Sequence, residues 1–339
     1  MAEKRIVTIG EALIDFIPMQ KGTALKDVPA FERVAGGAPA NVAAGAAKLG
    51  ARAAMVVKLG QDAFGDHIVE ALAAAGVDVS FVLRTDRANT GLAFAALDAA
   101  GNRAFTFYRS PSADMLLEPD ELPAAAFEDC ACLHFGSVDL IEAPVKAAHR
   151  AAIAMAKAAG AIVSFDPNIR LPLWPSPEEC RKAVRAFLPL ADIVKLSDEE
   201  LEFVTGHADP EAGINALLDG GCRLALYTMG GAGASLYTRD WRVTVPAVDV
   251  PVFDTTGAGD SFAAAMLREL TRRGMGPGAL DRIPAEELAD MLVFADYYAA
   301  FTTMGKGAIA AMADREVIDA FIGQRQALSP LRPQIVRRR

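Results

Sequence analysis

Short apolar runs rich in β-forming residues alternate with longer alanine-rich stretches along most of this chain. The apolar runs have the length of buried strands, and the stretches between them favour helix. Strands are predicted at residues 5–9, 54–59, 131–135, 161–165, 192–196 and 223–228. Helices are predicted at residues 39–49, 62–75, 144–159, 177–187, 198–204, 211–218, 259–273, 285–301 and 314–323. This alternation predicts an α/β fold, in which helices cover both faces of a mostly parallel sheet.

Two segments interrupt the alternation. Residues 91–109 have the pattern of a β-hairpin with its turn at residues 98–102, and residues 12–31 suit a further strand of the same excursion. We expect a small β lid, built from about residues 12–35 and 91–110, over the carboxyl edge of the main sheet, where such sheets bind ligands. An antiparallel extension of the main sheet is the alternative. Residues 1–339 are otherwise expected to form one domain.

The balance of charge excludes one class of function. The 339 residues include 34 Lys and Arg against 43 Asp and Glu, which gives a formal net charge of −9. Nucleic-acid binders gain most of their affinity by neutralising phosphates, so an acidic chain is a poor candidate for that role. The three arginines at residues 337–339 are expected to form a solvated tail.

The sequence indicates neither a membrane nor an oxidising compartment. No apolar run approaches the length of a membrane span, and acidic residues interrupt the start of the chain too early for a signal peptide. The cysteines lack metal-binding spacing and are expected to be buried thiols: Cys130, Cys132, Cys180 and Cys222. We therefore expect a cytoplasmic protein without nucleic-acid or membrane partners.

The most informative motif is the string DTTGAGDSF at residues 254–262, which precedes a predicted helix. Gly257 and Gly259 permit a tight turn, after which the first N–H groups of the helix form an anion site. Asp260 would repel a bound anion, and its presence is explained if it accepts a proton from an attacking hydroxyl. The alternative is that Asp260 only caps the helix and the glycines only make a turn. The helix start should keep Asp260 ionised, with a pKa no higher than the ordinary value of about 3.9.

Two further strings could bind a polar ligand. GGAPAN at residues 36–41 opens a predicted helix, and Gly36 and Gly37 would let a ligand approach the backbone. Asn41 can both donate and accept hydrogen bonds, as recognition of a vicinal diol requires. Asp15 lies among apolar residues and needs a partner, which two sugar hydroxyls or a structural salt bridge would supply. A plain glycine turn with a capping Asn is the alternative for residues 36–41.

Together these motifs resemble the PfkB, or ribokinase-like, family of carbohydrate kinases. The resemblance runs from Ile6 to about Ala311 and includes two family signatures, a glycine-rich stretch that ends at Gly50 and the string at residues 254–262. The strings at residues 107–117 and 165–176 are similar to those of the fructokinase branch. The resemblance implies a three-layer αβα sandwich with a small β lid, and a homodimer that pairs through its lids. It also implies ATP-dependent phosphorylation of a sugar hydroxymethyl group, with Mg²⁺.

The same resemblance implies roles for individual residues. Asp260 matches the catalytic base, beside an anion hole at Gly257, Ala258 and Gly259. The positions that match sugar contacts are Asp15, Gly36, Gly37 and Asn41. The positions that match the nucleotide site are Thr228, Gly230 and Gly233.

Metal sites are implied at two places. Ser197 and Glu200 match the family's Asn-x-x-Glu motif, which orders Mg²⁺ through water, although Ser197 replaces the Asn. The positions that match a monovalent cation site, for K⁺, are Asp254, Thr256 and Gly307. Met304 departs from the family pattern there, because many members have threonine at that position.

A net charge of −9 disfavours polyanionic ATP, so local positive charge must offset it. Lys195, Arg109 and Arg170 are the candidates, in addition to Mg²⁺ and the helix start. Arg170, in the string Asn168-Ile-Arg170, is expected to contact substrate or phosphate, with a surface ion pair as the alternative. Arg109 on the predicted hairpin could contact the sugar.

The leading interpretation is a fructokinase, which converts fructose and ATP to fructose 6-phosphate and ADP. Within the same family, 2-keto-3-deoxygluconate kinase is an alternative, because Arg109 could bind the carboxylate of an acid sugar. A nucleoside kinase fits the string at residues 107–117 less well. A non-catalytic sugar- or nucleotide-binding relative is the alternative from another class, although it would not need Asp260.

Overall fold

The strands of the central sheet run side by side with most of their side chains buried. In this computed structural model, which describes residues 4–20, 22–97 and 103–338, the described strands form a ten-stranded sheet in the order β14-β13-β12-β11-β10-β9-β8-β1-β4-β5. Neighbouring strands from β11 to β5 are parallel, and β12, β13 and β14 are antiparallel to their neighbours. The strands are β1 (Arg5–Ile9), β4 (Ala53–Gly60), β5 (Val82–Thr85), β8 (Cys130–Phe135), β9 (Ile162–Phe165), β10 (Ile193–Ser197), β11 (Leu224–Thr228), β12 (Ala234–Tyr237), β13 (Trp241–Val245) and β14 (Gln334–Arg337).

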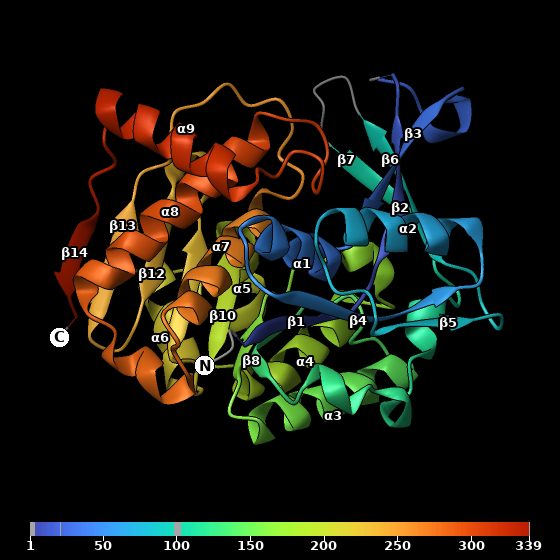
Figure 1. Cartoon of the computed structure of the whole chain (residues 1–339), viewed down its shortest axis with the longest axis horizontal. Coiled ribbons are helices and arrows are strands. Elements are labelled where there is room, and N and C mark those ends of the chain that lie inside the picture. Colours follow the sequence, from blue (N-terminus) through green and yellow to red (C-terminus); the bar gives the residue numbers. More distant parts are fainter. Residues whose placement is uncertain (1–3, 21, 98–102, 339) are drawn as a thin grey trace.

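Helices cover both faces of this sheet, as Figure 1 shows. One layer contains α1 (Ala38–Lys48), α2 (Ala63–Ala74), α7 (Ala258–Arg272), α8 (Ala285–Thr303) and α9 (Arg315–Leu328). The other contains α3 (Pro144–Ala158), α4 (Pro177–Phe187), α5 (Asp198–Thr205) and α6 (Pro210–Asp219). Within β1, Ile6 packs against the first layer while Val7 and Ile9 pack against the second, because successive side chains of a strand point to opposite faces. The expected three-layer αβα sandwich is confirmed.

A second, four-stranded sheet lies apart from the first and has the order β3-β2-β6-β7. Its strands are β2 (Leu13–Pro18), β3 (Phe31–Gly36), β6 (Gly91–Leu97) and β7 (Arg103–Tyr108). The single strand expected over residues 12–31 is wrong, because Pro18 and Pro29 interrupt it and two antiparallel strands, β2 and β3, form instead. β6 and β7 pair as the expected hairpin, whose turn at residues 98–102 lies outside the described residues.

Every strand and helix predicted for the α/β body is present, with shifted ends in several cases. α9 continues to Leu328, past the end expected at Gly323, because a glycine on an exposed turn weakens a helix without breaking it. The sequence analysis missed β5, β12, β13 and β14. These are short strands in which pairing with neighbours, rather than an apolar run, decides the conformation.

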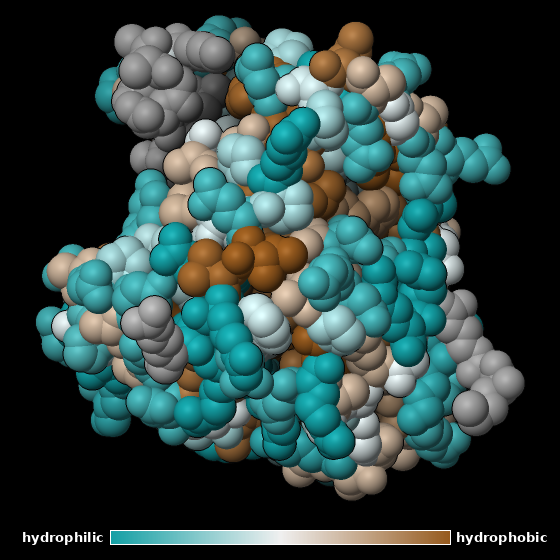
Figure 2. Space-filling model, turned by 90° about the vertical axis from the view of Figure 1, so that its left-hand side faces the viewer, coloured by the Kyte–Doolittle hydropathy of each residue, from teal (hydrophilic) through white to brown (hydrophobic). Residues whose placement is uncertain are grey.

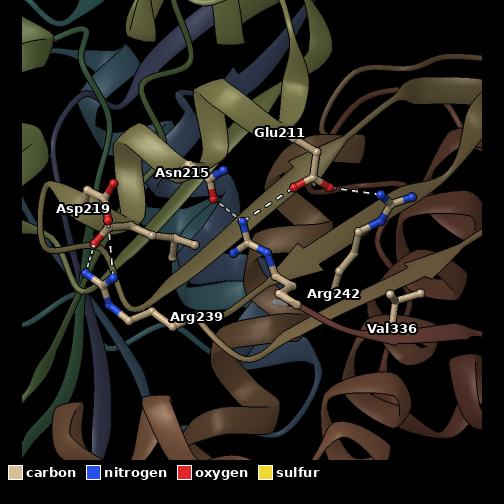
Figure 3. A pocket seen from close by; sticks show the side chains of 8 residues that line it. Glu211, Asn215, Asp219, Arg239, Arg242 and Val336 are labelled. Atoms are coloured by element: carbon tan, nitrogen blue, oxygen red, sulfur yellow. Dashed lines mark hydrogen bonds and ion pairs between the residues drawn. The ribbon is translucent and has the colours of Figure 1, made fainter.

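The expected solvated arginine tail is only partly correct, because Arg337 is exposed but ends a strand, and Arg338 is partly buried. β14 pairs with β13, and the guanidinium of Arg338 donates to the carbonyl of Thr238 (2.7 Å) and to the amide of Asn215. Figure 3 shows arginines of this region interleaved with Glu211 and Asp219 of α6. The acidic side chains neutralise the arginines, so this part of the chain adds an edge strand rather than a basic patch.

Three features bear on the expectations of reduced cysteines and of no membrane span. All four cysteines are free and buried, as expected. Among the described helices, none combines the length and apolar character that crossing a bilayer requires. The face in Figure 2 is covered mainly by hydrophilic side chains, with small separate hydrophobic patches.

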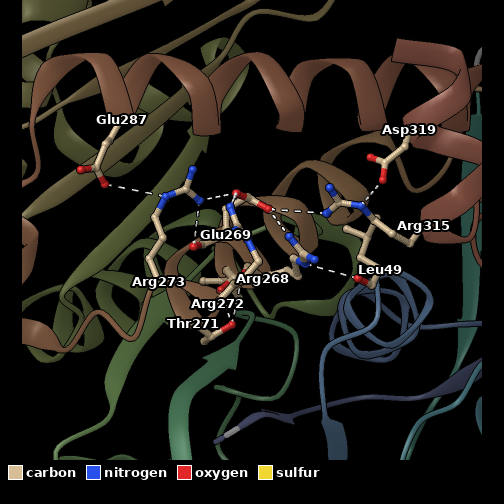
Figure 4. Close-up of polar contacts among 10 residues, drawn as sticks. Leu49, Arg268, Glu269, Thr271, Arg272, Arg273, Glu287, Arg315 and Asp319 are labelled. Atoms are coloured by element: carbon tan, nitrogen blue, oxygen red, sulfur yellow. Dashed lines mark hydrogen bonds and ion pairs between the residues drawn. The ribbon is translucent and has the colours of Figure 1, made fainter. Parts of the chain in front are cut away.

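One buried carboxylate on helix α7, that of Glu269, contacts several arginines. Glu269 is surrounded by four arginines, Arg268, Arg272, Arg273 and Arg315, which Figure 4 shows converging on it. Arg268 also donates to the carbonyl of Leu49 at the end of α1 (3.2 Å). Burial alone would raise the pKa of Glu269, but hydrogen bonds from Arg272, Arg273 and Arg268 lower it to about 2. The cluster therefore joins α7 to α1 and α9 through one charge.

We expect Glu269→Gln to destabilise the protein by about 3 kcal/mol, because four guanidinium groups would lose the charge that holds them together. Since the pKa of Glu269 is lowered on folding, its stabilisation is present near neutral pH and is lost as the pH falls toward about 2. Urea unfolding at neutral and acid pH measures both effects. Glu287→Gln is the matched control, because Glu287 is half exposed and meets only Arg273, at 3.8 Å. Equal losses in the two variants would contradict this assignment.

Candidate active site

The corner between β1 and β2 packs backbone to backbone against the start of α1. Gly37, with φ of +105°, has no room for a side chain, because a Cβ would overlap the carbonyl of Glu11 and lie 2.9 Å from Cα of Ala12. A Cβ on Gly36 would overlap the carboxylate of Asp15. The carboxylate of Glu11 accepts a hydrogen bond from the backbone N–H of Ala38 (3.0 Å). The glycines at residues 36 and 37 therefore bring α1 directly onto the corner.

The start of α7 is a second glycine turn. Gly257 adopts φ of +78°, and a Cβ there would lie 2.6 Å from the Cβ of Ala308. Ala258 donates its N–H to the carbonyl of Thr255 (3.2 Å). For Gly259 and Asp260 the described residues supply no backbone acceptor, so these N–H groups of the first turn remain for a ligand. Within the predicted anion hole, the N–H of Ala258 is therefore bonded inside the turn and that of Gly259 is not.

The two helix starts meet through their side chains. The amide nitrogen of Asn41 donates to Oδ2 of Asp260 (2.7 Å), which joins residues 219 positions apart in the chain. Burial raises the pKa of Asp260 to about 6, although the hydrogen bond from Asn41 acts in the opposite direction. The expectation that the helix start keeps this pKa at its ordinary value is wrong, because desolvation outweighs the hydrogen bond from Asn41 and the charge of Lys195, which favour the ionised form. Asp260 is therefore a stronger base than the sequence indicated.

A cavity of about 290 Å³ opens between these groups. Its lining includes predicted residues from both sequence halves: Asp15, Gly37, Asn41, Asn168, Arg170, Lys195, Thr256, Gly257, Gly259 and Asp260. Asp260 therefore lines the same cavity as Asp15 and Asn41, the residues expected to contact a sugar. Gly36 and Ala258 lie next to the lining rather than in it.

Lys195 places a buried positive charge at the anion hole. Its ammonium group donates to Asp166 (2.7 Å) and lies 3.1 Å from the position of a Cβ on Gly259. Burial alone would lower the pKa of Lys195, but Asp166 and Glu200 raise it. Lys195 is therefore cationic beside the first turn of α7. Arg170 lines the same cavity, next to Asn168, which adopts a left-handed φ of 44°.

The expectation for Arg109 needs correction. Its guanidinium is 2% exposed and is bound by Asp114 and Asp139, so it does not line the cavity. Arg109 follows directly after β7, and its partner Asp139 comes from a segment that sequence spacing does not relate to it. A sugar carboxylate would find this cation already neutralised.

The residues matched to the nucleotide site lie along the carboxyl edge of the sheet, beyond the cavity. Ser197 ends β10 and is paired in register with Thr228, which ends β11. Glu200 accepts from the N–H and hydroxyl of Ser197 (3.0 Å each) and from the N–H of Ile169 (2.7 Å). After Thr228 the chain turns through Gly230 to Gly233, where a Cβ would overlap the end of β13.

The residues matched to a monovalent cation site also come together. Asp254 accepts from the N–H and hydroxyl of Thr256 (2.9 and 2.7 Å) through Oδ1. Its Oδ2 accepts from the N–H of Gly307 (3.0 Å). This loop adjoins the cavity through Thr256.

The sequence analysis missed several residues of the lining: Glu11, Leu13, Ala38, Phe107, Val138, Asp166, Leu173 and Thr255. Glu11 and Asp166 follow closely after the carboxyl ends of β1 and β9. Because ligands of open α/β sheets bind at that edge, a polar residue just beyond a predicted strand was the available signal.

An α/β sandwich with a base at a glycine-lined helix start, facing polar groups from distant segments, has the architecture of a phosphotransferase. The model of the pfkB family of carbohydrate kinases matches residues 3–315, and the chain belongs to this family.

Its relatives are similar over nearly their whole length. Fructokinase-1 of Zea mays is 44% identical over 305 residues, which cover 90% of this chain and 93% of the relative. The crystal structure of a fructokinase with bound ATP from Xylella fastidiosa is 36% identical, with a TM-score of 0.87, over 96% of this chain and 99% of that one. A fructokinase from Vibrio cholerae O395, in a form with bound fructose, ADP and calcium ion, is 33% identical with a TM-score of 0.83, over 94% and 99%.

We expect Asn41→Ala to raise the pKa of Asp260 above about 6, because the lost hydrogen bond stabilises the ionised carboxylate. Titration of the Asp260 carboxyl carbon by NMR measures the shift without any substrate. Asn215→Ala, on exposed α6, is the control and should leave that titration in place. A lowered or unmoved pKa in Asn41→Ala would show that Asn41 does not tune this carboxylate.

Proposed function

We propose that this chain transfers the γ-phosphoryl group of ATP to the 6-hydroxyl of fructose. The observation that carries the proposal is the contact between Asn41 and Asp260 at the mouth of a cavity that Asp15 also lines. The side-chain amide of Asn41 and the carboxylate of Asp15 can form hydrogen bonds with the hydroxyls of a sugar. In this arrangement Asp260 faces the hydroxyl that reacts. The names of the relatives supply the choice of fructose within the family.

In this proposal Asp260 acts as the general base. The hydroxyl oxygen attacks the γ-phosphorus in line, its proton passes to Asp260, and the bond from the γ-phosphorus to the bridging oxygen breaks with the electron pair leaving on ADP. A base with a pKa of about 6 is ionised at neutral pH yet accepts a proton more readily than an ordinary Asp. Asn41 holds the carboxylate in place for this step.

Two features of the chain offset the charge of the transferring group. The N–H groups of Gly259 and Asp260 are aligned with the axis of α7, whose start carries partial positive charge. Lys195 adds a full charge beside Gly259, and Asp166 fixes its position. Donors held in place before reaction stabilise the transition state at little reorganisation cost.

The side chains near the site can be compared with the ligands that Mg²⁺ and K⁺, the ions implied by the family, prefer. The described residues contain no group of three or more His, Cys, Asp or Glu side chains that could cage a metal. This fits Mg²⁺, which protein sites usually hold through one or two carboxylates, water and the substrate phosphates, where it neutralises phosphate charge. Glu200 would hold it through water, because three donors already occupy most of its carboxylate. K⁺ would be held at Asp254, Thr256 and Gly307, where carbonyl groups of the loop are available despite Met304.

The same geometry removes one argument for the main alternative. Arg109, the cation expected to bind the carboxylate of 2-keto-3-deoxygluconate, is paired with two carboxylates. Pairing of two chains through their small sheets, and a cytoplasmic location, remain predictions.

A substrate panel tests the proposal. ADP release is measured with ATP and, in turn, fructose, ribose, 2-keto-3-deoxygluconate and nucleosides. We expect the highest kcat/KM with fructose. A higher value with another member would transfer the assignment to that substrate, and binding without turnover of any member would favour a non-catalytic relative.

We expect Asp260→Asn to lower kcat by a factor on the order of 10² to 10⁴, because the base is lost while its contact with Asn41 can persist. In the unmodified protein, kcat/KM should fall as the pH drops below about 6, where Asp260 becomes protonated. Circular dichroism and the unfolding midpoint provide the control for folding. Near-complete turnover in a folded Asp260→Asn protein would refute the base assignment.

A further inference from the structure

We propose that Glu11 is a positioning residue for the sugar site, because its side chain accepts the first N–H of α1 and so fixes where that helix begins. The inference rests on the proposed function for its kinetic part only, since its structural part can be measured without substrate.

The first step is the contact between Glu11 and α1. Oε1 of Glu11 accepts the N–H of Ala38 (3.0 Å), the first residue of α1, whose N-cap Gly37 has no side chain to do so. Gly37 also rests on the backbone of Glu11 and Ala12. The Glu11 carboxylate therefore takes the place of a capping side chain and sets the direction in which α1 begins.

The second step is the connection from α1 to the base. Asn41 lies three residues beyond Ala38, in the first turn of α1, and donates to Asp260. A displaced helix start would move Asn41 and Gly37 together. Because both line the cavity, the sugar site depends on the contact between Glu11 and Ala38.

The third step is the set of charged groups near Glu11. Arg109, which follows β7, binds Asp114 and Asp139, and both Arg109 and Asp139 act electrostatically on Glu11. All four side chains are buried, so three carboxylates share one guanidinium without solvent. If all were ionised, two negative charges would remain in excess, which such a site does not tolerate.

Protonation removes part of this excess. Burial and the neighbouring Asp139 raise the pKa of Glu11 to about 8, so at neutral pH its carboxyl keeps a proton. Several polar atoms of the cluster have no hydrogen-bond partner among the described residues: Oε2 of Glu11, Oδ2 of Asp139 and Nη1 of Arg109. The acid proton of Glu11 therefore has an unused acceptor within the cluster. Oε1 meanwhile remains the acceptor for Ala38.

Other charged groups approach Glu11 from the elements around it. His149 of α3 lies near Gly10, and its burial lowers its pKa to about 4, so it is neutral. Across the cavity are Asp15, Asp166, Lys195, Asp260 and Arg170. Two carboxyls near Glu11 also have raised pKa values, Asp139 at about 7 and Asp260 at about 6, and both titrate below the range in which Glu11 does.

Two substitutions separate positioning from a general structural role. Glu11→Met keeps the length of the side chain and removes the acceptor, and Glu11→Gln keeps an acceptor for Ala38 and a donor in place of the acid proton. We expect Glu11→Met to speed amide hydrogen exchange in the segment at residues 36–41 by a factor on the order of ten. We expect its KM for fructose to rise by about tenfold with little change in the KM for ATP. Its unfolding midpoint should fall little, because the buried Glu11 carboxyl is already protonated at neutral pH and the substitution removes no paired charge.

Glu11→Gln should restore most of the exchange protection and of the fructose KM. In the unmodified protein the KM for fructose should rise above about pH 8, where Glu11 loses its proton, and Glu11→Gln should lack this rise. Glu128→Gln, an exposed acid on the same body, is the control and should behave like the unmodified protein in all of these measurements.

The outcomes are distinguishable. Unaltered exchange at residues 36–41 in Glu11→Met would overturn the inference, whatever the substrate. A lowered unfolding midpoint with parallel losses in both KM values, unrescued by Glu11→Gln, would also overturn it in favour of a structural role. If the unmodified protein phosphorylates no sugar, the proposed function fails, and the exchange data alone decide the positioning role.

Discussion

The hydrogen bond between Asn41 and Asp260 is the contact on which the site depends. It joins the first turns of two helices that pack side by side in one layer but are 219 residues apart in the chain. Each turn is brought there by glycines that admit no side chain: Gly37 against the corner after β1, and Gly257 against Ala308. The small residues are therefore requirements of packing at the site, as well as openings for a ligand.

Burial gives the site its chemical character. Although the protein is acidic, charged groups of both signs line this cavity. Burial acts on the pKa of each group, and the neighbours of each group decide whether its charge persists. Lys195 remains cationic because Asp166 and Glu200 favour its charge, while Asp260 becomes easier to protonate. The cavity thus holds a cation and a carboxyl group of raised pKa within a small volume, and each has its own partner, Asp166 for Lys195 and Asn41 for Asp260.

The sequence was sufficient for the architecture and for the glycine-lined helix starts, because periodicity and glycine spacing are local signals. It was insufficient where the decisive partner is distant. Arg109 was read as a sugar contact because nothing local reveals Asp139, which neutralises it. Glu11 and Asp166 carry no motif of their own, and only their positions just beyond strand ends mark them. The pKa of Asp260 depends on how completely the fold excludes water, which no pattern of residues encodes. β14 was missed because its conformation comes from pairing with β13.

The small sheet is assembled from two pieces of chain separated by part of the body. Its inner strands β2 and β6 run parallel, and between them the chain builds α1, β4, α2 and β5. A parallel pair of this kind cannot close as a local hairpin, so its contact order is high and its formation waits for the intervening units. The covering sheet and the body therefore constitute one cooperative unit, and neither segment could be transplanted to another scaffold as an autonomous module.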